Sequence, residues 1–91
     1  MSGTRKKSAK RVLIRDQEGL DLLGQKLRQI RKLKGFTQEE LAFESGLALS
    51  QIFRIEKGQI NPTASTLFAI SRALKISPAE LFSFVENQKK K

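Results

Sequence analysis

Residues 38–58, QEELAFESGLALSQIFRIEKG, decide how this chain folds. They divide into two short segments with helical character, and Gly46 between them can take the positive φ that turns the chain. Thr37 stands directly before the first segment and forms an S/T-x-x-E capping box with Glu40. The first helix is therefore predicted to begin after Thr37 and to end near Gly46, and the second to cover residues 49–57 and to stop at Gly58.

The turn between these two segments is too tight for an ordinary helical hairpin. A small residue is needed where two helices cross closely, a glycine where the chain turns, and large apolar residues in the angle between the helices. The positions that meet these needs are Ala42, Gly46, Leu41, Ile52 and Ile55. One of them alone would mean little, but all five at this spacing predict a helix-turn-helix.

Three further helices are predicted around this motif. Apolar residues three and four apart indicate a helix from about Leu20 to a stop at Gly35. Thr63 is expected to cap a fourth helix, and residues 77–80, SPAE, form a second capping box that starts a fifth helix, from residue 78 to about residue 86. The buried stripes are expected at Leu20, Leu23, Leu27 and Ile30 and at Leu67, Ile70 and Leu74. The chain is thus predicted to be all-α, a single compact five-helix domain.

The length and composition narrow the functional classes. The chain has 91 residues, enough for one domain, and neither a long apolar run nor a secretory signal pattern, so we expect a cytoplasmic protein. It has no Cys and no His, which excludes disulfides, Cys/His metal sites and His-based nucleophile pairs. We therefore expect no enzyme activity, no cofactor and no metal.

The net charge of +9 suggests a polyanionic partner, and it is concentrated at the two ends. Residues 1–34 carry a net +8, residues 35–86 a net −2 and residues 87–91 a net +3. We predict a flexible basic arm over residues 1–18, the helical domain over residues 19–86 and a basic tail over residues 87–91. The arm has two alternatives: a solubilising tail, or a segment that docks on the domain through Val12-Leu13-Ile14.

The stretch from about residue 23 to residue 82 resembles the lambda-repressor-like helix-turn-helix family, also called the XRE or Cro/C1 type. The resemblance is carried by TQEELA at 37–42, SQIFRIEKG at 50–58, NPTASTL at 61–67 and ALKISPAELF at 73–82. It implies a lambda-repressor-like domain that regulates transcription by binding a palindromic DNA operator in sequence-specific fashion, as a homodimer. Two positions depart from the family: Ala48 stands where a polar N-cap is usual, and Lys75 where a left-handed glycine commonly ends the fourth helix.

A helical wheel of about 100° per residue places the core side of residues 49–57 toward Ile52 and Ile55. Ser50, Arg54 and Lys57 then point away from the domain, with Phe53 and Gln51 on the shoulders. By resemblance, the residues that contact base edges are Leu49, Ser50, Phe53 and Arg54. Arg54 suits guanine, and Leu49 or Phe53 suits thymine methyl groups. The alternative for Leu49 and Phe53 is partial burial.

Contacts to the DNA backbone are expected from two regions. The helix-turn-helix and the loop after it would supply Gln38, Gln51, Lys57 and Asn61, and the arm would supply Arg5, Lys6, Lys7, Lys10 and Arg11. Gln38 would act at a helix N-terminus, where free N–H groups favour a phosphate. The alternative for Gln38 is a solvated residue in the first turn.

Two charged residues fall on inward stripes of the wheel, Arg31 on the first helix and Glu56 on the third. The resemblance implies that they form an ion pair between these helices. The alternative is two separate side chains that reach solvent.

Two further features bear on partners. The fifth helix is apolar over a wide arc, part of which is expected to form a dimer surface unless the whole helix is intramolecular. The competing functional hypothesis is an antitoxin or co-regulator that uses the same fold to bind a protein partner such as a toxin, motivated by the −2 balance of residues 35–86.

Overall fold

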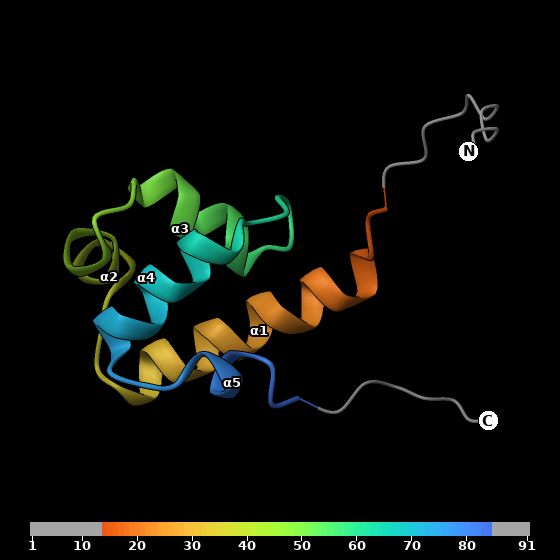
Figure 1. The fold of residues 1–91 in the computed structure, drawn as a ribbon. Helices are drawn as coiled ribbons and strands as arrows, with labels where there is room; N and C mark the ends of the chain where they lie inside the picture. The colour runs from red at the N-terminus through yellow and green to blue at the C-terminus, as the bar shows by residue number, and fades with distance from the viewer. Residues whose placement is uncertain (1–13, 85–91) are drawn as a thin grey trace, which may run out of the picture.

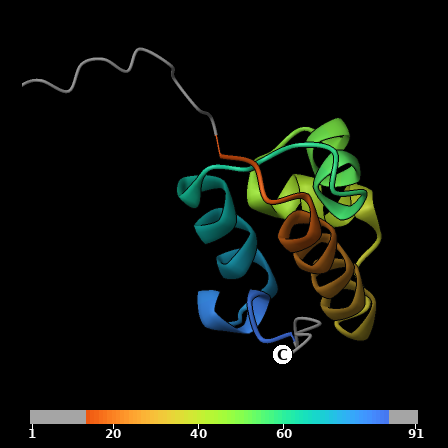
Figure 2. The ribbon, with the colours of Figure 1, turned by 90° about the vertical axis from the view of Figure 1, so that its right-hand side faces the viewer.

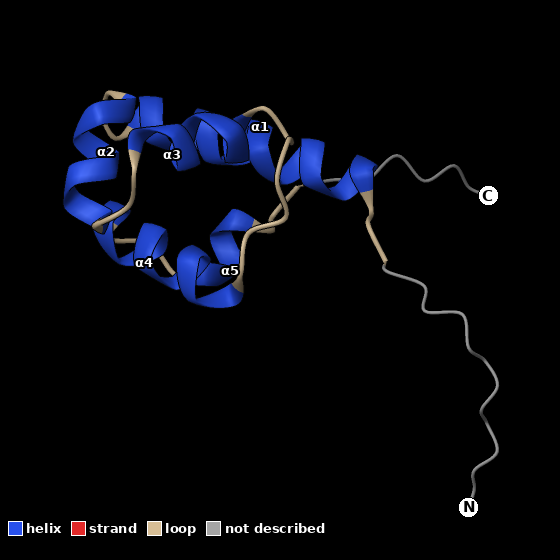
Figure 3. Ribbon diagram, turned by 90° about the horizontal axis from the view of Figure 1, so that it is seen from above, coloured by secondary structure: helices blue, strands red, loops and turns tan. Residues whose placement is uncertain are grey.

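A computed structural model describes residues 14–84, which fold into five helices (Figure 1). Their order is α1 (Gln17–Leu33), α2 (Gln38–Ser45), α3 (Leu49–Glu56), α4 (Ala64–Leu74) and α5 (Pro78–Leu81). No strand occurs in this part of the chain (Figure 3). The prediction of an all-α, five-helix domain is confirmed.

Side-chain caps set where α2 and α4 begin. At α2 the capping box is complete: Glu40 N–H donates to Thr37 Oγ1 over 3.0 Å, and Thr37 N–H donates to Glu40 Oε1 over 2.9 Å. At α4 the N–H of Thr66 donates to Thr63 Oγ1 over 3.1 Å. Both caps lie where the sequence pattern predicts them.

The helix α1 begins earlier than its apolar stripe suggests. Asp16 is the N-cap, since its Oδ1 accepts from Gly19 N–H over 2.9 Å. The first turn of α1 therefore includes residues 17 and 18, which the charge pattern assigns to the arm.

The prediction for the fifth helix is wrong in its cap and in its length. The Ser77 side chain makes no capping hydrogen bond, and α5 ends at Leu81. Ser83 closes the turn instead, because its N–H and its hydroxyl both donate to the carbonyl of Glu80, over 3.2 Å and 2.8 Å. These short-range bonds satisfy a terminal carbonyl and end the helix after one turn. The predicted continuation through residues 85 and 86 lies outside the described residues.

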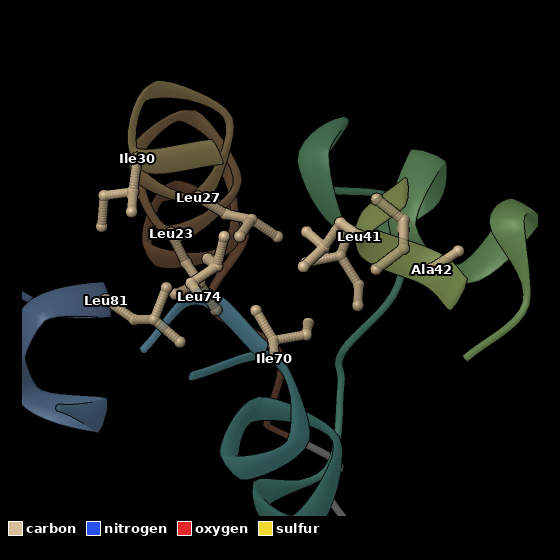
Figure 4. Close-up of a cluster of buried hydrophobic side chains, with 10 residues drawn as sticks. Leu23, Leu27, Ile30, Leu41, Ala42, Ile70, Leu74 and Leu81 are labelled. Atoms are coloured by element: carbon tan, nitrogen blue, oxygen red, sulfur yellow. The ribbon is translucent and has the colours of Figure 1, made fainter. Parts of the chain in front are cut away.

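The core lies between the helices, and every helix contributes to it (Figure 4). Its buried apolar residues are Leu23, Leu27, Ile30, Leu41, Ala42, Ile52, Ile55, Ile70, Leu74 and Leu81. In Figure 2 the two longest helices, α1 and α4, flank this interior, with α2 and α3 at one end and α5 at the other. The predicted buried stripes of α1 and α4 largely agree with these core residues, although Leu20 and Leu67 are only partly buried.

The helices α1 and α3 pack unusually closely at Gly24. A Cβ added there would collide with the main-chain carbonyl oxygen of Ile55 and lie 2.6 Å from that of Glu56. Because both obstacles are backbone atoms, no side-chain rotation could make room. Gly24 thus allows the C-terminal end of α3 to rest directly on α1.

Candidate nucleic-acid interface

The turn between α2 and α3 sets the angle at which α3 leaves the domain. Gly46 is the C-cap of α2 and has φ 75°, in the left-handed region that favours glycine. Leu47 N–H then donates to the carbonyl of Ala42 over 3.0 Å. This turn carries α3 along the upper edge of the molecule in Figure 1.

The start of α3 has half of a capping box. Ala48 is the N-cap and its side chain makes no hydrogen bond. Its N–H nevertheless donates to Gln51 Oε1 over 3.2 Å. The side-chain oxygen of Gln51 thus accepts one hydrogen bond, while its amide nitrogen donates none within residues 14–84.

The outward side of α3 carries the four residues expected at base edges. Ser50 and Arg54 are exposed, and within residues 14–84 neither side chain makes a hydrogen bond. Leu49 is 44% exposed and Phe53 43% exposed, so each presents an apolar surface to solvent. These exposed fractions fit both the base-contact prediction and the alternative of partial burial.

The predicted backbone-contact residues lie around this surface. Lys57 is exposed, and its Nζ stands 5.6 Å from the centroid of the Phe53 ring. Asn61 is exposed in the loop between α3 and α4, and Gln38 is half-buried at the first position of α2. The arm residues Arg5, Lys6, Lys7, Lys10 and Arg11 lie outside the described residues.

The inward side of α3 ends in a buried ion pair. Arg31 Nε donates to Glu56 Oε2 over 2.6 Å, and Arg31 Nη2 donates to Glu56 Oε1 over 3.1 Å, so the contact uses two parallel N–H groups. Arg31 Nη1 donates to the carbonyl of Phe36 over 2.8 Å. The guanidinium therefore joins α1, α3 and the segment before α2.

Gln38 belongs to the same network. Its Nε2 donates to Glu56 Oε1 over 2.9 Å, so that carboxylate receives hydrogen bonds from both α1 and α2. A half-buried side chain at the first position of α2 is thus fixed by the buried end of α3. It is not the freely solvated residue of the alternative interpretation.

The sequence pattern gives no sign of a second network, at the turn that follows α3. Arg15 Nη2 donates to the carbonyl of Gln59 over 3.1 Å, and Gln17 Nε2 donates to the carbonyl of Gly58 over 2.8 Å. Gln17 also bonds Asp21 over 2.9 Å. Figure 2 shows the segment before α1 passing beside the loop after α3. The residues just before and at the start of α1 are therefore tied to the turn after α3.

Other kinds of site find less support in the described residues. No group of three or more His, Cys, Asp and Glu side chains lies together there as metal ligands would. No helix among residues 14–84 is long and apolar enough to cross a membrane.

The Helix-turn-helix family model matches residues 27–81, which include α2, the turn, α3 and α4. The chain belongs to the helix-turn-helix family. This match, which covers the motifs quoted above as far as Leu81, confirms the resemblance to the XRE type. In regulators of this kind the second helix of the motif binds DNA, and in this chain the second helix of the motif is α3.

Named relatives point in the same direction. The control protein C.BamHI of Bacillus amyloliquefaciens is 44% identical over 64 residues, 69% of this chain and 79% of that protein. An HTH-type transcriptional regulator of Sinorhizobium fredii, y4dJ, is 38% identical over 60 residues, 66% of this chain and 78% of that protein. The chain is thus a DNA-binding transcriptional regulator, and these relatives are regulators rather than enzymes.

A solved structure gives the same result for the fold. The restriction-modification controller protein C.AhdI from Aeromonas hydrophila is 44% identical, with a TM-score of 0.69, over 69% of this chain and 96% of that protein. The fold and the sequence therefore agree on the family.

Proposed function

We propose that the protein binds a palindromic operator as a homodimer, with α3 of each subunit in the major groove, and thereby regulates transcription in the cytoplasm. The observation that carries this proposal is the outward side of α3, where Ser50 and Arg54 are exposed and make no hydrogen bond within residues 14–84. Polar groups left free on a fixed helix can bond base edges without breaking contacts in the domain.

Each residue on this side has its own task. Arg54 donates two N–H groups to O6 and N7 of guanine, which is the commonest specific contact in the major groove. Ser50 bonds a neighbouring base edge through its hydroxyl. Leu49 and Phe53 pack against thymine methyl groups, which fits their half-exposed apolar surfaces.

The phosphate contacts come from groups that the fold leaves available. Gln38 uses one amide hydrogen on Glu56 and keeps the other, next to the free N–H groups of the first turn of α2. Gln51 uses its oxygen on Ala48 N–H and keeps its amide nitrogen. Lys57 and Asn61 add further groups for phosphate contacts, at the end of α3 and in the loop that follows it.

Dimerisation supplies the second half-site. Two recognition helices about 34 Å apart, one turn of DNA, read a site with two-fold symmetry. The surface beside α5 suits an interface, because Phe82 is 51% exposed and its ring lies 6.3 Å from that of Phe84.

The arm adds affinity with little specificity. If two or three arm charges in each subunit meet phosphates, deletion of the arm from a dimer lowers the log–log salt slope of binding by roughly 4 to 5 units, at about 0.9 per phosphate. Titrations of the full chain and of a chain without residues 1–13 at several salt concentrations measure this. An unchanged slope would leave the arm as a solubilising tail, and lost folding cooperativity would indicate a docked segment.

A control role in a restriction-modification system is the finer proposal. It is supported by the 44% identity to C.BamHI and to C.AhdI, both named as controllers. Methyltransferase and endonuclease genes beside the gene for this chain would support it. A neighbouring toxin-like gene would favour the antitoxin alternative, which rests only on the −2 balance of residues 35–86.

The decisive experiment is selection of bound fragments from random DNA by the full chain, followed by sequencing and by measurement of the stoichiometry on the selected site. We expect an inverted repeat with half-site centres about ten base pairs apart and two chains bound. A single unrepeated motif bound by one chain would contradict the dimer, and the absence of any enriched motif would contradict sequence-specific binding.

A further inference from the structure

Two apolar side chains on the outward side of α3 lie outside the hydrophobic core. Leu49 and Phe53 stand four positions apart, so they are neighbours on one side of the helix. They are about equally exposed, 44% and 43%, and neither belongs to the hydrophobic core or to the apolar residues packed around it. On a surface that faces DNA, each is available to contact a base.

The ring of Phe53 has a neighbour that holds it at this surface. Lys57, one turn later, places its ammonium 5.6 Å from the ring centroid, within the range of a cation–π contact. The ammonium lies over the ring, at an exposed position from which it can also meet a phosphate. The ring edge is thus kept on the outward side.

The major groove offers one apolar feature to such side chains, the methyl group at C5 of thymine. Cytosine carries a hydrogen at C5, and C5-methylation of cytosine places a methyl group at the equivalent position. The two methylated pyrimidines then differ in the groove at the neighbouring group, a carbonyl acceptor in thymine and an amino donor in cytosine. A contact with the methyl group alone does not distinguish them.

Two of the polar residues nearby, Ser50 and Gln51, do not restore this distinction. Ser50 can either donate or accept through its hydroxyl, so it suits both the carbonyl and the amino group. The oxygen of Gln51, which would prefer an amino donor, is already bonded to Ala48 N–H. The outward side of α3 therefore contains an apolar pair beside a hydroxyl group that tolerates either pyrimidine.

We propose that Leu49 and Phe53 make α3 a reader of pyrimidine C5-methyl groups, so that methylation of a cytosine opposite either side chain raises the affinity for that operator. This rests on the proposed function and deepens it, because it names the chemical group that is read. It also makes operator affinity responsive to cytosine methylation of the DNA.

The test uses the selected operator and the full chain. Deoxyuridine differs from thymidine only in lacking the methyl group, so each thymine of a half-site is replaced in turn. We expect about fourfold weaker binding for each contacted methyl group, the equivalent of about 0.8 kcal/mol. At the same positions, 5-methylcytosine paired with guanine should bind about fourfold more tightly than cytosine paired with guanine.

Variants assign each effect to a side chain. Leu49→Ala and Phe53→Ala should each abolish the methyl dependence at one position and leave it at the other. Because both residues lie outside the core, the variants should retain the folding transition of the parent chain in thermal melts. Phe43→Ala is the matched control: Phe43 is 84% exposed on α2, and its removal should leave every methyl effect unchanged.

The outcomes distinguish a failure of the methyl-reading proposal from a failure of the proposed function. An operator that is bound with sequence specificity but equally well with thymine and deoxyuridine at every position overturns the methyl reader and leaves the proposed function intact. Methyl effects that persist in both alanine variants also overturn it. A selection that returns no motif overturns the proposed function, and the methyl reader with it.

Discussion

The two sides of α3 differ in how their polar groups are satisfied. On the inward side, Glu56 receives hydrogen bonds from Arg31 and Gln38. On the outward side, the side chains of Ser50 and Arg54 make none within residues 14–84. The eight residues of α3 thus stabilise the fold on one side and leave side chains free to bind DNA on the other. Substitutions on the two sides should separate accordingly, those inward lowering the free energy of unfolding and those outward weakening DNA binding.

The largest effect should come from the ion pair. Arg31→Ala or Glu56→Ala alone should lower the free energy of unfolding by about 3–5 kcal/mol, since each leaves an uncompensated buried charge. The double variant should lose much less than the sum, which urea melts of all four chains measure. Arg28→Ala, at an exposed position of α1, is the control. Strictly additive losses would mean that the two charges do not stabilise each other.

The second largest loss of stability is expected for Gly24→Ala. The added methyl group would collide with the carbonyls of Ile55 and Glu56, so α1 and α3 would have to move apart. Overpacking of this kind costs about 1–3 kcal/mol, measured by the same urea melts. Gln25→Ala, at the adjacent exposed position, should change stability by less than about 0.5 kcal/mol. Equal stability of the Gly24 variant and its parent would show that the helices are not held in close contact.

Arg54→Ala should weaken DNA binding and leave stability unchanged, the opposite of the two substitutions above. We expect binding to the selected operator to weaken by about 1–3 kcal/mol, with preference relaxed at one base pair in each half-site. Urea melts should hardly change, because the side chain is exposed and unbonded. Equal weakening on every DNA sequence would make Arg54 a phosphate contact and remove it from base reading.

Gln38, the first residue of α2, is expected to contribute both to stability and to DNA binding, so it is the sharpest test of their separation. Gln38→Ala should cost about 1 kcal/mol of stability through the lost bond to Glu56. It should also weaken binding to specific and random DNA by the same factor, since phosphate contacts carry no sequence information. Gel-shift titrations on both DNAs and a urea melt measure the two effects. A changed base preference would contradict the phosphate role.

Sequence reasoning works where the signal is local. The capping box at Thr37 and the turn at Gly46 depend on residues within one or two turns, and both are observed as predicted. The cap of α5 is missed, because SPAE matches the capping pattern while the Ser77 hydroxyl makes no such bond. The contacts of Arg15 and Gln17 are missed for another reason. Their acceptors are main-chain carbonyls more than forty residues away, and any residue supplies a carbonyl.

The smallest effect should come from Lys75, which lies on neither side of α3. It ends α4 in the left-handed region, with φ 58° and ψ 46°, where a side chain is disfavoured by about 1–2 kcal/mol. Lys75→Gly removes that strain but makes the unfolded chain more flexible, at a cost of about 0.5–1 kcal/mol. We expect a net gain of roughly 0.5–1 kcal/mol in urea melts, with operator affinity unchanged. Lys75→Ala loses the same charge and keeps the strained backbone, so it should show no such gain. Equal gains in both variants would trace the effect to charge and not to the backbone.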